Sequence, residues 1–399
     1  MSPIKRQFFL AFMVMGSVLP YLPVFLAQRG LSMSQIGAVM SVTGLGIMVS
    51  PVAMTLLADW RVPSRAILAA VLGVSAGALA ALAGAHEFVA VMLAHGVFAV
   101  AFAPVTAVQD GLFFARAQEI RRVADGPRPP GYHTVRVYGT VGFIVPSLVL
   151  YALLWLGVDT TAAVWCAAAC ALLGVANAFT LPHIATNGTP ATPVNNGPFR
   201  GRRLPTAAAA RAMLEPHVLV FCVALLLLHL AITAYYSFYP VYLTETVGIA
   251  ERWIGLISSL GVTIEIGFIL GTGWLLRRWG LRRLMVIGAV CMAIRFALLA
   301  WLPVGTVAVG TQLFHGIMVL VVHVAPPIYL NHRAEDAFRS SIQGLFAMTV
   351  MGVGRILGNL LGGAVAEVSL TAVFWVCTAL AAAAAALFAF AFADGIDDA

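Results

Sequence analysis

Long apolar runs dominate this chain, and residues 253–276 form one that is long enough to cross a membrane as a helix. As a helix rising about 1.5 Å per residue, a run of about 20 residues crosses a hydrocarbon core about 30 Å thick. This run also carries one carboxylate, Glu265, near its middle. An ionised carboxylate at mid-bilayer depth costs at least ~2.5 kcal/mol, and residues kept there are usually functional. Glu265 is therefore the first candidate functional residue, and the alternative is a carboxylate that only holds two helices together.

The same kind of run recurs along the whole chain, so the sequence predicts an all-α membrane protein with twelve transmembrane helices. Hydrophobic residues make up 61% of the chain and charged residues 10%, whereas soluble domains are about 25% charged. Spans of this length must be helical because only a helix satisfies its own backbone groups in lipid. The expected spans are residues 7–28, 35–58, 65–85, 88–114, 134–156, 161–181, 217–240, 252–276, 284–302, 307–330, 340–365 and 371–393.

Lysine and arginine mark one face of the membrane. Alternate loops on one side carry nearly all of them, and the opposite side has only Arg29 and Arg252. The basic side holds Lys5, Arg6, Arg61, Arg65, Arg116, Arg121, Arg122, Arg128, Arg200, Arg202, Arg203, Arg211, Arg277, Arg278, Arg282, Arg283, Arg333 and Arg339. Cytoplasmic loops are the basic ones, so we expect both termini in the cytoplasm and the chain in the inner or plasma membrane. The net charge of +7 is then a topology signal and not a nucleic-acid-binding surface.

The longest polar gap divides the chain into two halves. Residues 182–216 are rich in Pro, Asn, Gly and Arg, a composition typical of linkers. We expect a six-helix N-terminal half over residues 1–181, a cytoplasmic linker over 182–216 with a short surface helix at 207–214, and a six-helix C-terminal half over 217–399. The loop after the second span, LLADWRVPSR, resembles the loop after the eighth, GWLLRRWGLRR. Such an internal duplication is typical of secondary transporters.

Several other classes of protein lack support in the sequence. Lys5 is the single lysine, which excludes the nucleotide-binding loop of an ATP-driven pump. The five cysteines (Cys166, Cys170, Cys222, Cys291 and Cys377) all lie in apolar runs, so they are interpreted as core residues and not as a metal site or disulfide framework. We therefore expect no enzyme, cofactor or metal. A channel is the main rival, but no continuous polar stripe or pore loop is visible.

The loops after the second and eighth spans carry a known motif. Gly273, Arg278, Gly280, Arg282 and Arg283 match the outline Gly-x-x-x-Asp-Arg-x-Gly-Arg-Arg, with Arg277 at the acidic position; in the first half Asp59 and Arg65 remain, but Thr55 and Val62 replace glycines. In this motif the chain resembles the major facilitator superfamily of transporters over its whole length. The resemblance implies the major facilitator fold and makes Asp59, Arg65 and Arg278 candidates for a conformational latch.

A finer resemblance is to proton symporters of the lactose permease and 3-phenylpropionate permease type. Asp110 in APVTAVQDGLFF and Arg136 in VRVYGTVGF stand where these permeases keep an acidic residue and an arginine for substrate. Two opposite charges near the membrane centre also offset each other's desolvation. Arg295 and His315 have the spacing of the permease proton pathway. Glu265, Arg295 and His315 are accordingly predicted to couple proton movement to transport.

Two departures separate the chain from lactose permease. The acidic proton carrier three residues after the histidine is here Met318, so Glu265 is expected to carry the proton instead. The tryptophan that stacks on a galactoside is here Phe143, which disfavours a lactose-like substrate. The pair His315 and His323 resembles the phenylpropionate branch. Eight residues place them about 80° apart on a helix, so both can face one cavity.

Four other side chains are candidates for the substrate site. Tyr235, Tyr236 and Tyr239 lie together in the seventh span, where some of them would form an interfacial aromatic belt and one or two would line the cavity. Arg355 lies within GVGRILGNLLGG, where Gly354, Gly358 and Gly362 form a small-residue stripe that suits close helix packing. A structural role for Arg355, bound to backbone carbonyls, is as well supported as a substrate role.

These features together predict a monomeric, proton-coupled importer of a small organic solute. Arg136 and Arg295 outweigh Asp110 once Glu265 is protonated, which favours an organic anion, above all an aromatic carboxylate. Importers of sugars, nucleosides or siderophores and a drug efflux pump remain alternatives. A change in the distance between Glu265 and Arg295 during transport would load and release the proton.

Overall fold

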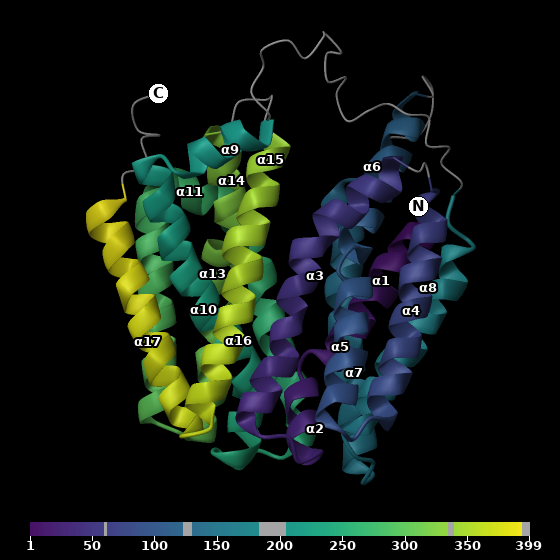
Figure 1. The fold of residues 1–399 in the computed structure, drawn as a ribbon, viewed down its shortest axis with the longest axis horizontal. Coiled ribbons are helices and arrows are strands. Elements are labelled where there is room, and N and C mark those ends of the chain that lie inside the picture. The colour runs from purple at the N-terminus through teal and green to yellow at the C-terminus, as the bar shows by residue number, and fades with distance from the viewer. Residues whose placement is uncertain (60–61, 123–129, 183–204, 334–338, 393–399) are drawn as a thin grey trace.

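The computed structural model describes residues 1–59, 62–122, 130–182, 205–333 and 339–392. Within these ranges the chain is all helix and turn, with no strand, and its helices form two bundles side by side (Figure 1). The N-terminal bundle contains α1 (Ser2–Val18), α2 (Leu22–Gln28), α3 (Met33–Asp59), α4 (Ser64–Gly84), α5 (Phe88–Phe102), α6 (Val105–Arg122), α7 (Tyr132–Trp155) and α8 (Thr161–Ala178).

Two spans of the N-terminal bundle are broken near prolines. The first span is interrupted between α1 and α2 at Pro20, with Pro23 in the first turn of α2, and the fourth is interrupted between α5 and α6 at Pro104. Proline removes a backbone hydrogen bond and clashes with the preceding turn. α6 then continues to Arg122, beyond the expected end at residue 114, because the polar helical turns that follow extend past the apolar run.

The C-terminal bundle is more irregular. It contains α9 (Pro205–Met213), α10 (Pro216–Glu245), η1 (Glu251–Trp253), α11 (Ile254–Trp301), α12 (Gly305–Gly310), η2 (Thr311–Phe314), α13 (His315–Val319), η3 (Leu320–Val324), α14 (Ala325–Arg333), α15 (Arg339–Phe346), η4 (Ala347–Gly352), α16 (Val353–Ala366), α17 (Leu370–Ala386) and η5 (Leu387–Ala391). The elements η3, η4 and η5 are π-helical turns. α9 falls where the short surface helix was predicted.

Among the described residues, eleven helical segments are long and apolar enough to cross a membrane. One of them, Glu251–Trp301, contains two predicted spans. Its long helix α11 is interrupted between these spans at Gly280, which has φ 72° and ψ 165°. This left-handed conformation is one that glycine adopts without steric cost. Counting the two arms of α11 separately gives the predicted twelve helices.

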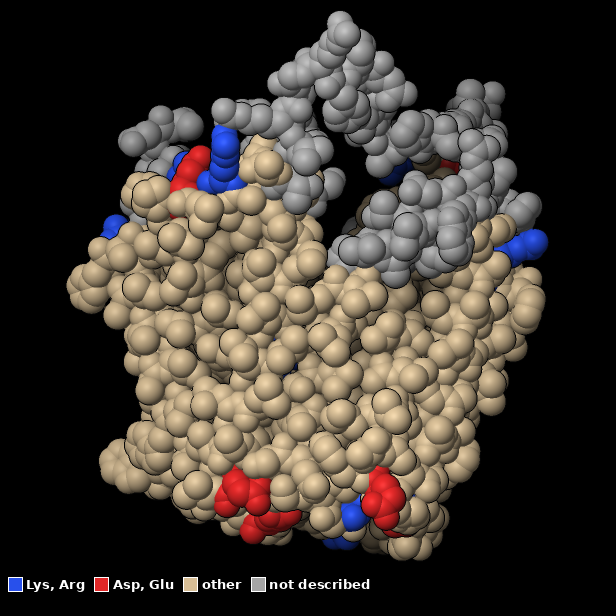
Figure 2. Space-filling view, in the orientation of Figure 1, with Lys and Arg blue, Asp and Glu red and all other residues tan. Residues whose placement is uncertain are grey.

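Charged side chains collect at the two ends of the molecule. On the face shown in Figure 2, Lys, Arg, Asp and Glu lie at both rims, and the broad belt between them is almost free of charge. The start of α1 and the end of α17 lie at the same end of the bundle (Figure 1). The belt is the surface that the hydrocarbon core would cover.

The halves meet at the end of the molecule opposite the N-terminus. Tyr21 Oη accepts a hydrogen bond from the Gly255 backbone N–H at 3.1 Å, and the Ser147 and Ser259 hydroxyls are 2.8 Å apart. Glu367 Oε2 accepts the backbone N–H of Ser34 at 2.8 Å, and this bond holds the pKa of the Glu367 carboxyl below its usual value. Toward the other end the halves diverge, and Figure 2 shows a notch between them.

Glycines set the spacing inside the C-terminal half. A Cβ on Gly358 would lie 2.7 Å from the Leu230 carbonyl oxygen, and one on Gly362 would lie 2.9 Å from Ala234 Cβ. The predicted small-residue stripe of α16 therefore packs against α10, as close helix contact in membranes requires.

Candidate functional site

A cavity of about 320 Å³ lies between the two halves. Its volume is in the range of small-molecule sites, which begins near 300 Å³. The residues that line it are Phe12, Met15, Leu19, Pro20, Met40, Thr43, Arg136, Thr140 and Phe143 from the N-terminal half, and Thr233, Tyr235, Tyr236, Ser237, Tyr239, Pro240, Ser258, Val262, Glu265, Gln312, His315, Val319, His323, Arg355 and Asn359 from the C-terminal half. Most of the residues predicted for substrate and proton therefore lie on one cavity wall or the other.

Glu265 pairs with His315 across two elements of the C-terminal half. Glu265 Oε2 lies 3.6 Å from His315 Nε2, with 22% and 10% of the two side chains exposed. Gly261 permits the approach, because a Cβ there would lie 2.6 Å from Gln312 Oε1 and 2.9 Å from the His315 ring. Both members of the pair can hold a proton, and both line the cavity. The structure therefore brings these two residues together, and their predicted role in proton coupling stays a prediction.

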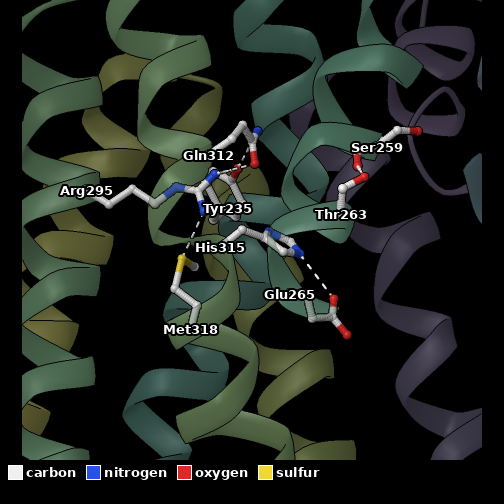
Figure 3. Close-up of polar contacts among 8 residues, drawn as sticks. All are labelled: Tyr235, Ser259, Thr263, Glu265, Arg295, Gln312, His315 and Met318. Carbon is white, nitrogen blue, oxygen red and sulfur yellow. Dashed lines mark hydrogen bonds and ion pairs between the residues drawn. The ribbon is translucent and has the colours of Figure 1, made fainter. Parts of the chain in front are cut away.

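Arg295 lies behind this pair and does not contact Glu265. Its fully buried guanidinium donates to Gln312 Oε1 at 3.0 Å and to the Tyr235 hydroxyl, and it lies 3.0 Å from Met318 Sδ. Figure 3 shows His315 between the Arg295 cluster and Glu265. The predicted influence of Arg295 on Glu265 would therefore pass through neighbouring residues and not through a direct contact, and it stays a prediction.

The Arg295 cluster continues through neutral hydrogen bonds. Gln312 Nε2 donates to the Tyr239 hydroxyl at 3.0 Å, and that hydroxyl donates to the Ala308 carbonyl oxygen at 2.8 Å. Tyr235 and Tyr239 are 1% and 3% exposed. The prediction that part of the tyrosine group forms an interfacial belt is wrong for Tyr235, Tyr236 and Tyr239, which all line the cavity. Buried partners satisfy the hydroxyls of Tyr235 and Tyr239.

The N-terminal wall presents one charged group, Arg136. Its guanidinium lies 4.2 Å from the centroid of the Phe12 ring, a stacking distance for a cation on an aromatic face. Phe143 and Thr140 line the same wall, on the α7 helix that carries Arg136. The wall thus offers a cation, a hydroxyl and aromatic surface.

Asp110 differs from its predicted place. It is not among the described residues that line the cavity, and no ion pair joins it to Arg136 in the described part of the chain. The Tyr132 hydroxyl donates to Asp110 Oδ1 at 2.8 Å instead. The expected direct pairing is wrong because this phenol supplies the partner, a residue that the sequence analysis did not consider.

His323 and Arg355 both reach the cavity from the C-terminal half. The His323 ring, in the π-helical turn η3, lies 5.5 Å from the ring of His229 on α10. Arg355 makes no hydrogen bond or ion pair within the described ranges, so binding to backbone carbonyls, the structural alternative, is absent there. His229 was missed by sequence reasoning because a lone histidine in an apolar run carries no motif.

Polar neutral residues were also missed. Ser237 donates to Asn359 Oδ1 at 2.6 Å, and both residues line the cavity with Gln312 and Thr140. The spacing in the sequence could have indicated Gln312, because it precedes His315 by three residues and so lies on the same helix face. The predicted latch stays a prediction: Arg65 and Arg278 are exposed, and the side chain of Asp59 lies outside the described ones.

Two helical halves around one central cavity, with titratable groups at membrane depth, define a secondary transporter of the major facilitator superfamily. The chain belongs to the MFS_1 like family, whose sequence model matches residues 2–377. It is thus a transporter and not an enzyme.

Relatives and a solved structure extend this result. YegT of Escherichia coli (strain K12), provisionally named a nucleoside transporter, is 27% identical over 386 residues, 92% of this chain and 84% of the relative. The xanthosine permease of the same strain is 25% identical over 380 residues, covering 90% and 86%, and its probable 3-phenylpropionic acid transporter is 25% identical over 394 residues, covering 94% and 93%. The crystal structure of a mutant of the nucleoside transporter NupG gives a TM-score of 0.86 at 22% identity, covering 98% and 99%.

Proposed function

We propose that this protein imports nucleosides together with protons. The cavity between the halves carries the proposal, because its lining combines groups that can bind a base and a sugar with titratable groups that can bind a proton. Phe143 and Tyr236 offer ring faces for a base, while Asn359 and Thr140 offer amide and hydroxyl groups for a sugar. Relatives named for nucleoside and xanthosine transport support nucleosides over the other solutes considered from sequence.

Glu265 and His315 are the proposed proton carriers. An ionised carboxylate at membrane depth is costly, so protonation or a bound partner determines which forms of the empty carrier can reorient. Glu265 would take a proton when the cavity faces the outside and release it inside, with His315 as its neighbour at 3.6 Å. Arg295 would tune the pair through Gln312 and Tyr235.

The cellular membrane, the oligomeric state and the orientation of the chain belong to the same proposal. We place the chain in the inner membrane as a monomer with both termini in the cytoplasm, with the halves divided at the linker 182–216. The end where the halves meet then faces outward, and the structure corresponds to the inward-facing state of an alternating-access cycle.

An uptake assay tests the proposed function. Purified protein in liposomes should accumulate radiolabelled nucleosides when the outside is made acidic, and the flux should saturate and be stimulated by nucleoside on the far side. Uptake that fails for every nucleoside while a pH gradient is present would overturn the proposal. Conductance without saturation or exchange would indicate a channel.

An aromatic carboxylate is the second candidate substrate. Arg136 and Arg355 both line the cavity, and arginine binds a carboxylate through two parallel hydrogen bonds. Competition by 3-phenylpropionate without competition by any nucleoside would favour this candidate.

A further inference from the structure

Arg355 is an unusual cation for a membrane interior because no described residue neutralises it. It lies in α16, just after the π-helical turn η4, and is half-buried on the cavity wall. In the described part of the chain its guanidinium has no hydrogen-bond acceptor and no carboxylate within 4 Å. Glu265 is the one carboxylate among the described lining residues, and its near partner is His315.

Two histidines lie next to Arg355 in this corner of the cavity. His323 lines the cavity beside Arg355, and its ring lies 5.5 Å from that of His229. His229 is 3% exposed, and its Nε2 has no hydrogen-bond partner. α16 packs directly on it, since a Cβ on Gly354 would lie 2.8 Å from His229 Cβ. Tyr236 and Asn359 complete the lining here and are neutral hydrogen-bonding groups.

A guanidinium at this depth without hydrogen-bond acceptors favours a compensating anion. Arginine stays charged under all physiological conditions, and a buried charge is tolerated when it is paired. The residues that the structure describes supply no anion to Arg355, whereas they give Arg295 a set of neutral acceptors. The ligand is therefore the natural source of the negative charge.

Resting on the proposed nucleoside function, we propose that Arg355, with His323 and His229 beside it, selects nucleosides whose base is negatively charged at neutral pH. A 2,6-dioxopurine nucleoside loses its ring N3 proton near neutral pH and leaves a charge shared between N3 and O2. This planar O–C–N edge has two adjacent acceptors, as a carboxylate has, so it matches the two-donor fork of arginine. Inosine lacks the 2-oxo group and stays neutral.

Paired uptake of xanthosine and inosine tests the inference. Xanthosine carries the ionised 2,6-dioxopurine, and inosine is its neutral counterpart. At pH 7 the wild-type carrier should prefer xanthosine, and Arg355→Gln should lower the ratio of xanthosine to inosine affinity by at least about tenfold, the range for a lost charge-assisted bond. Inosine uptake by the same variant shows that it folds and transports.

Two further variants separate charge from structure. Arg355→Lys should recover part of the preference, because the charge stays and the fork is lost. Arg116→Gln removes a positive charge from an exposed pair with Glu119 and should leave the ratio unchanged. An unchanged ratio in Arg355→Gln, or a wild-type preference for inosine, would overturn the inference while leaving nucleoside transport intact. Failure of both nucleosides in wild type would instead overturn the proposed function.

Discussion

The two walls of the cavity differ in what they present. The N-terminal wall has one charged side chain, Arg136, set among apolar and hydroxyl groups. The C-terminal wall carries Glu265, His315, His323 and Arg355, with Arg295 buried behind them. The halves share a fold but not a chemistry, which shows that duplication of the helix plan does not require duplication of the site.

This difference suggests a division of tasks between the walls. On the proposed function, the N-terminal wall would hold the substrate through Arg136 and aromatic surface, while the C-terminal wall would respond to the proton and to the charge of the ligand. Alternating access moves one wall against the other, so the proton pair is exposed to opposite sides of the membrane while staying within a single half. The following experiments, from the largest expected effect to the smallest, test whether the tasks are divided in this way.

Removing the charge change at Glu265 should have the largest effect. Glu265→Gln should abolish uphill accumulation, because the amide cannot take up or release the proton. Counterflow exchange should stay within about twofold of wild type, since binding and rocking do not need the charge change. Both are measured in proteoliposomes, with Glu119→Gln as an exposed control. Accumulation at the wild-type level would remove Glu265 from the coupling mechanism.

Changing the single cation of the N-terminal wall should weaken binding without uncoupling. Arg136→Lys keeps the charge but loses the planar fork and its stacking on Phe12, so affinity should fall by about tenfold or more. Isothermal calorimetry measures the affinity, and the number of protons carried per substrate should stay as in wild type. Unaltered affinity would show that the N-terminal wall does not hold the substrate.

Crowding the end where the halves meet should slow transport moderately. A methyl group on Gly255 would lie 2.6 Å from the Tyr21 hydroxyl, so Gly255→Ala should destabilise the observed state and lower exchange by about threefold to tenfold, equivalent to about 1 kcal/mol. Adding Tyr21→Phe removes that hydroxyl and should restore part of the rate. No rescue in the double variant would argue against this contact.

The smallest effect is expected away from both walls. Tyr132→Phe removes the donor to Asp110, which should cost about 1 kcal/mol of stability while substrate affinity and proton coupling stay as in wild type. Thermal unfolding and uptake measure the two quantities. A loss of coupling would return Asp110 to the transport mechanism, where sequence resemblance had placed it.

The sequence predicted the fold well and the site in part, for physical reasons. Apolar run length specifies membrane helices because each run must span the bilayer, and the basic loops predict their orientation. The Glu265–His315 pair was found because a carboxylate at that depth demands a partner. The Asp110 contact was missed because partners between helices depend on rotation and tilt, and a phenol such as Tyr132 carries no charge signal. His229 was missed because its interest comes from its burial beside His323, which only the structure shows.

The reversal of the chain at Gly280 has a mechanical consequence for proton coupling. Only Gly280 within α11 has a non-helical backbone conformation, so the arms carrying Glu265 and Arg295 are joined by a hinge of a single residue with no spare length. A connection this short limits how far the two arms can move apart at Gly280. The change in distance between Glu265 and Arg295 that the sequence suggested stays a prediction, and it would have to come from bending at Gly280 or rotation of a helix.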